Sequence, residues 1–190
     1  MKYIITNIVY SIETEDIDTY RESKGISESI TDEEVKTEIQ NSLFPHLILI
    51  VEPDDDNNDL REALNNTISD ETGWCVETYV ATELAKYVMT QLNNFMEFDA
   101  EFWTKKFGCD AADVVNLYGF GYDTENRLGY WSVDKYTLVS VNLEEIALKI
   151  ASIQESSHDV TDAEIQEMRN LIFEIFDVNE TEESAKNTQL

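Results

Sequence analysis

The N-terminal stretch KYIITNIVYSIE, residues 2–13, decides how the first half of the chain is interpreted. Apolar side chains alternate with polar ones and β-branched and aromatic residues dominate, which is typical of a β-strand. The alternation changes parity near Asn7, so we expect the strand to bend or bulge there. The run HLILIVE at 46–52 is apolar enough to predict a buried central strand beside it, and residues 74–81 predict a third strand.

Helix signals separate these strands. Residues 15–29 are polar and are expected to form a connection between elements. The tetrapeptide TDEE at 31–34 is a capping box, in which the Thr hydroxyl and the Glu carboxylate bind the first free amides of a helix. An acidic turn at 53–58 precedes a second predicted helix at 59–73.

The second half of the chain is more helical. Apolar spacing predicts a helix at 84–96. Asp99 is expected to cap a short helix up to Phe107, which Gly108 stops, and Asp110 to cap another that ends at Gly119. The capping boxes NLEE (142–145) and TDAE (161–164) open two more helices. Turn signals within 120–141 predict a β-hairpin or meander. The expected fold is therefore α+β: a small β-β-α-β unit with a helical insertion at 1–82, a mostly helical region with a hairpin at 83–176, and a disordered tail at 177–190.

The charge is the most informative part of the composition. Lys and Arg number 13 and Asp and Glu number 40, so the net charge is 13 − 40 = −27. The excess is spread over both halves, −15 in residues 1–85 and −12 in 86–190. Binding to phosphate backbones or anionic lipid needs clustered basic residues, so direct nucleic-acid or membrane binding is not expected. A hydrophobic content of 42% predicts a folded protein all the same.

The sequence also bears on the cellular compartment and on catalytic or metal chemistry. The N-terminus does not have the pattern of a signal peptide, no segment predicts a membrane span, and the presence of only two cysteines favours reduced thiols in the cytoplasm. No motif for a catalytic nucleophile, a phosphate-binding loop or a zinc site is present, so we expect no enzyme activity, no cofactor and no metal. A cysteine–histidine nucleophile pair stays open as a less favoured alternative.

Aromatic residues concentrate between residues 100 and 140. This density suits an interface anchor, although a second hydrophobic core is the favoured explanation. The residues are Trp103, Phe107, Tyr118, Phe120, Tyr122, Tyr130, Trp131 and Tyr136.

Acidic side chains supply the candidate partner-binding site. Carboxylates spaced three or four residues apart on a helix place their Cβ atoms about 5–6 Å apart, close to the phosphate spacing along one nucleic-acid strand. The candidates are two such pairs, Glu34 with Glu38 and Glu164 with Glu167, and the dense patch Asp54, Asp55, Asp56 and Asp59.

Part of the chain resembles small acidic proteins of bacteriophages and mobile elements, which are built as strand, strand, helix, strand. The resemblance rests on YIITNI (3–8), LILIVEPDDD (47–56), DLREAL (59–64) and ISDETGWCV (68–76), and the short proteins lack an insertion near 14–44. The overall character is similar to that of DNA-mimicking anti-CRISPR and antirestriction proteins.

The charge and this resemblance predict a non-enzymatic inhibitor. Its partner would be a basic nucleic-acid-binding protein, either a nuclease such as a CRISPR effector or restriction enzyme, or the ribonucleoprotein complex of such a nuclease. The acidic surface would occupy the partner's nucleic-acid groove. One alternative is an immunity protein that neutralises a basic nuclease toxin. Another is an enzyme or small-ligand protein with an incidental acidic surface.

Overall fold

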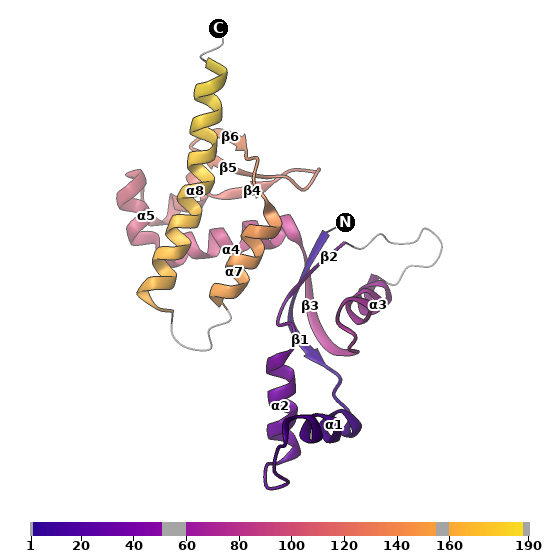
Figure 1. Cartoon of the computed structure of the whole chain (residues 1–190). Helices are drawn as coiled ribbons and strands as arrows, with labels where there is room; N and C mark the ends of the chain where they lie inside the picture. The colour runs from indigo at the N-terminus through magenta and orange to yellow at the C-terminus, as the bar shows by residue number, and fades with distance from the viewer. Residues whose placement is uncertain (1, 51–59, 155–159, 188–190) are drawn as a thin grey trace. The chain divides into compact units, whose positions relative to one another are not determined.

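The computed structural model describes residues 2–50, 60–154 and 160–187, with side chains up to residue 176. It is an α+β protein, as the sequence predicts. The chain divides into two compact units, Met1–Thr82 (unit 1) and Glu83–Leu190 (unit 2), which are described separately (Figure 1).

Unit 1 is a three-stranded sheet with helices in its connections. The strand order is β2-β1-β3, and β1 pairs with β2 in antiparallel register, with Tyr3 opposite Leu49. The elements in chain order are β1 (Lys2–Tyr10), α1 (Thr14–Lys24), α2 (Asp32–Ser42), β2 (Leu47–Ile50), α3 (Leu60–Thr72) and β3 (Val76–Glu83).

The predicted irregularity in β1 is confirmed. Asn7 has a φ of +52°, in the left-handed region that Asn tolerates better than most residues. The burial pattern changes at this point, because Tyr3, Ile4 and Ile5 are all buried before it and alternation resumes with Ile8 after it. The first part of β1, residues 3–5, is therefore buried on both faces, whereas the part after Asn7 is buried on one.

The prediction that residues 46–52 form a central strand is wrong. β2 lies at the edge of the sheet, and only one of its faces is packed, since Leu49 is 3% exposed while Ile50 is 62% exposed. An apolar run shows that a strand is hydrophobic. It does not show on how many sides other strands cover it.

The predicted connection at 15–29 is also wrong over most of its length, because α1 occupies it. The helix begins without a Ser or Thr cap; instead the Asp16 carboxylate accepts a hydrogen bond from the Glu13 N–H at 2.8 Å. Ile17 is the buried residue of α1, and Gly25, at φ +66°, ends the helix. With so few apolar residues, α1 carries almost no periodic signal.

Unit 2 combines helices with a small antiparallel sheet of order β4-β5-β6, which confirms the meander predicted at 120–141. The elements are α4 (Leu84–Phe98), α5 (Ala100–Phe107), the 3-10 turn η1 (Ala111–Asp113), α6 (Val114–Tyr118), β4 (Phe120–Tyr122), β5 (Leu128–Ser132), β6 (Lys135–Leu138), α7 (Leu143–Gln154) and α8 (Asp162–Asn187). α8 is helical through residues 177–187, where the composition predicts a tail.

Part of the predicted aromatic cluster lies in the core of unit 2. Trp103 is fully buried, and its ring contacts Phe107 and Phe173, while Phe176 of α8 stacks on Phe120. Tyr122 and Trp131 of the sheet are 38% and 40% exposed, and the remaining members are half-buried: Phe107, Tyr118, Tyr130 and Tyr136.

Helix caps decide where several of these elements begin. The boxes at Thr31 and Thr161 form as predicted, and Asn142 accepts hydrogen bonds from the N–H groups of Glu144 and Glu145. The caps predicted at Asp99 and Asp110 are not made by their side chains, and the Asp99 carboxylate binds Arg169 instead.

Candidate functional site

The predicted acidic residues fall into three groups. Glu34 and Glu38 lie on α2 of unit 1, whereas Glu164 and Glu167 lie on the first turns of α8 in unit 2. The patch at Asp54, Asp55, Asp56 and Asp59 lies outside the described residues. The described structure therefore brings together the two residues of each pair, with one pair in each unit.

Glu34 and Glu38 are exposed, yet both are engaged within unit 1. The N–H and hydroxyl of Thr31 donate to Glu34 Oε2 at 2.9 and 2.8 Å, and these bonds hold the pKa of that carboxyl below its ordinary value. The Tyr20 hydroxyl donates to Glu38 Oε1 at 3.2 Å. Burial, together with the charge of Glu38, raises the pKa of Tyr20.

The two residues of the second pair, Glu164 and Glu167, differ in exposure. Glu164 is half-buried and accepts hydrogen bonds from the N–H and hydroxyl of Thr161, both at 2.7 Å. Glu167 is exposed. Glu164 therefore helps to start α8, whereas Glu167 is directed to solvent.

A larger acidic surface is formed by residues 13–42, which comprise α1, α2 and their connection and which we call the acidic helix pair. The two helices lie side by side (Figure 1). Ten carboxylates lie within it against three basic residues, a net charge of 3 − 10 = −7. All except the half-buried Asp16 are exposed: Glu13, Glu15, Asp18, Glu22, Glu28, Asp32, Glu33, Glu34 and Glu38.

One of the three basic residues, Arg21, forms its hydrogen bonds within the acidic helix pair itself. The Arg21 guanidinium donates to the carbonyl oxygens of Ser27 and Ile30 at 3.0 and 2.6 Å and to Asp32 Oδ1 at 2.8 Å. Its side chain is only 14% exposed. Arg21 therefore fixes the connection between α1 and α2 and contributes little positive charge to the outer surface.

The acidic helix pair is held firmly on the sheet. The side-chain amide of Gln40 accepts a hydrogen bond from Tyr10 N–H and donates one to Ile8 C=O, both at 2.9 Å. Val35 and Ile39 of α2 are buried in the same core as the strand residues. Because α2 is tied to β1 and α1 packs on α2, the carboxylates sit on a fixed frame.

Sequence reasoning missed half of this surface. Glu15, Asp18 and Glu22 follow one another at spacings of three and four residues on α1, so they share one face of the helix. The sequence pattern predicts only a polar connection at 15–29. The signal that identifies α1 is the acidic pair Glu13 and Asp16, which replaces the usual Ser or Thr box.

Metal binding needs clustered His, Cys, Asp or Glu side chains, and thiol chemistry needs an accessible cysteine. The described residues hold no group of three or more His, Cys, Asp or Glu side chains that could bind a metal ion. Cys75 is an exposed free thiol and Cys109 a half-buried one.

None of the helices in the described part of the chain combines the length and apolar composition that a bilayer crossing requires.

Comparison with known proteins adds no family: no family model, curated protein or solved structure matches the chain.

Proposed function

We propose that the protein is a non-enzymatic inhibitor that binds a host nucleic-acid-binding defence protein, a CRISPR effector or a restriction enzyme, as an acidic mimic of nucleic acid. The observation that supports this proposal is the acidic helix pair, in which nine carboxylates are exposed, seven of them on two helices that are fixed on a sheet.

The spacing of the carboxylates suits a groove that normally holds phosphates. On α1, Glu15, Asp18 and Glu22 form a row, and on α2, Glu34 and Glu38 are one turn apart. Their Cβ atoms are separated by about 5–6 Å within each row. A basic groove that neutralises successive phosphates can neutralise such rows in the same way.

Fixing the carboxylates before binding favours affinity. Loose acidic side chains on an irregular loop would lose conformational entropy on binding, whereas helices docked on a core lose less. Long-range attraction between this surface and a basic groove also speeds association.

A charge-neutralised variant tests the proposal. The helix-pair variant replaces four exposed carboxylates that take no part in the described capping-box hydrogen bonds. The substitutions are Glu15→Gln, Asp18→Asn, Glu22→Gln and Glu33→Gln. The control variant makes the same chemical changes on α3 and β3 of the same unit: Glu62→Gln, Asp70→Asn, Glu71→Gln and Glu77→Gln. Both variants have a net charge of −27 + 4 = −23.

The measurement is displacement of a fluorescent DNA duplex from purified restriction enzymes and guide-loaded CRISPR effectors. The wild type and the control variant should displace the duplex from a member of the panel, and the helix-pair variant should need about tenfold more protein, as expected when several charge contacts are lost. Displacement that is equal for both variants would reject the helix pair as the site. Failure to displace DNA from every member, with tight binding to a nuclease toxin instead, would favour an immunity protein.

A further inference from the structure

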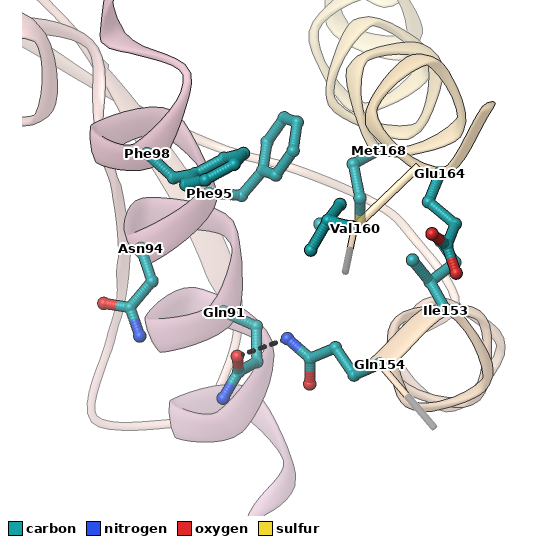
Figure 2. A pocket seen from close by; sticks show the side chains of 9 residues that line it. All are labelled: Gln91, Asn94, Phe95, Phe98, Ile153, Gln154, Val160, Glu164 and Met168. Carbon is teal, nitrogen blue, oxygen red and sulfur yellow. Dashed lines mark hydrogen bonds between the residues drawn. The ribbon is translucent and has the colours of Figure 1, made fainter. Parts of the chain in front are cut away.

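Unit 2 contains a groove that the proposed function does not use. It has a volume of about 280 Å³ and lies between α4, the end of α7 and the beginning of α8 (Figure 2). Phe95 and Phe98 of α4 line one side, and Val160 and Met168 line the other, so the two walls present apolar side chains to each other.

The apolar side chains at the rim are unusually exposed. Phe98 is 65% exposed, more than any other large apolar residue in the part of the chain whose side chains are described, and Val160 is 57% exposed. The buried face of α4, by contrast, includes Leu92 and Met96, each fully buried. Phe98 therefore lies outside the core, and covering it would bury apolar area that water now contacts.

Two polar ties hold the walls of the groove in place. Gln154 Nε2, at the end of α7, donates to Gln91 Oε1 of α4 at 2.7 Å (Figure 2). Arg169, next to Met168 on α8, donates to both oxygens of Asp99, next to Phe98, at 2.6 and 2.8 Å. A groove tied in this way is formed before anything enters it, which lowers the cost of binding.

We propose that this groove receives one or two large apolar side chains from a basic, amphipathic segment of a partner protein. The groove volume lies just below the range of about 300–1,000 Å³ that is typical of ligand pockets. A groove of this size suits one or two anchoring side chains better than a whole helix. The amides of Gln91 and Asn94 at its wall can hydrogen-bond the backbone of an inserted segment.

Charge decides which occupant fits. A second copy of this chain would bring another −27 charges to the groove, whereas a segment with Lys or Arg beside its apolar anchors would be attracted. Glu164 lines the groove, and the exposed Glu167 precedes Met168 on the same helix, so carboxylates lie where the basic flanks would pass. This inference goes beyond the proposed function and holds whether or not the acidic helix pair binds a nuclease.

Selection from a random peptide library, displayed against the full-length protein, tests the proposal. Two variants alter the groove, Asn94→Trp, which fills it from an exposed position, and Phe98→Ser, which removes an anchor contact. Phe44→Ser is the matched control, because Phe44 is 53% exposed and belongs to unit 1. The binding of selected peptides is then measured by fluorescence anisotropy, and the Met168 methyl is followed by NMR.

Selected peptides should carry Leu, Phe or Trp beside Lys or Arg, shift the Met168 methyl resonance, and bind both groove variants at least about fivefold more weakly than the wild type and the Phe44→Ser control. Peptides that bind the Asn94→Trp variant as well as the wild type, or that lack apolar anchors, would overturn the proposal. So would selection of no peptide at all. A wild-type dimer that Phe98→Ser dissociates in sedimentation experiments would assign the groove to a second copy and would also overturn it.

Discussion

Arg169 on α8 and Asp99 between α4 and α5 form a two-bonded ion pair across 70 positions of sequence, with N–O distances of 2.6 and 2.8 Å. The guanidinium also lies over the Phe102 ring, 4.0 Å from its centroid. The two side chains are only 24% and 12% exposed. The pair therefore joins the C-terminal helix to the helices at the start of unit 2.

Breaking this pair should destabilise unit 2. We expect Arg169→Ala and Asp99→Ala each to lower the free energy of unfolding by about 1.5–3 kcal/mol, because each leaves the other charge without its partner. The double variant should cost less than the sum of the two, and urea unfolding of all four proteins measures that coupling. Additive losses would show that the two residues act independently.

Asp99 also shows what the sequence can and cannot reveal. Its position before an apolar run indicates a helix start, and α5 does begin at Ala100. The partner of its carboxylate, however, is fixed only by the packing of α8, which no local pattern contains. The same limit explains β2, since a short apolar run does not distinguish an edge strand from a central one.

The candidate site was predictable in part for a related reason. Glu34 and Glu38 follow a Thr capping box and an apolar stripe, so both the helix and its acidic face are apparent from local patterns. The carboxylates of α1 depend instead on a helix with one buried residue, Ile17, which is stable because it packs on α2. Tertiary packing supplies what propensity and periodicity lack.

Replacement of a glycine in the small sheet of unit 2 should create a steric clash. Gly121 and Gly129 are paired across β4 and β5, and a Cβ added at Gly129 would lie 2.6 Å from the Tyr136 ring and hydroxyl and 2.7 Å from the Thr137 carbonyl oxygen. We expect Gly129→Ala to lower the free energy of unfolding by about 1–3 kcal/mol. Gly121→Ala, whose nearest contact is 3.2 Å, should cost less in the same urea titration. Equal costs would contradict this account.

The turn between β5 and β6 contains a strained valine. Val133 has a φ of +60°, which a β-branched residue rarely adopts, and it is 52% exposed. Val133→Gly should raise the free energy of unfolding by up to about 1 kcal/mol, because relief of strain exceeds the entropy that glycine adds to the unfolded chain. Ser132→Gly, one residue earlier in the strand, should lower it; a loss of stability in both variants would show that no strain is relieved.

The Thr31–Glu34 box predicts a pH dependence. Because hydrogen bonds from Thr31 lower the Glu34 pKa in the folded state, the folded protein binds this proton more weakly than the unfolded chain. The cap should therefore stabilise the protein above the ordinary glutamate pKa and lose its effect as the pH falls through the lowered value. The difference in Tm between the wild type and Glu34→Ala should shrink from about pH 7 to about pH 3. Glu33→Ala, in the same helical turn, is the control, and a Glu34→Ala difference that does not change with pH would argue against the cap.

The last prediction concerns how fast the acidic helix pair finds its partner. Electrostatic attraction is screened over about 10 Å at 0.1 M salt, so the association rate constant should fall steeply as salt is raised from low to physiological concentrations. The helix-pair variant and the control variant have the same net charge of −23, from −27 + 4, so overall charge cannot distinguish them. If the carboxylates of α1 and α2 face the basic groove, only the helix-pair variant should associate more slowly at low salt and show a weaker dependence on salt, with stopped-flow fluorescence as the measurement. Identical salt dependence in the two variants would mean that the partner responds to the total charge of the protein, and the helix pair would then have no special part in the encounter.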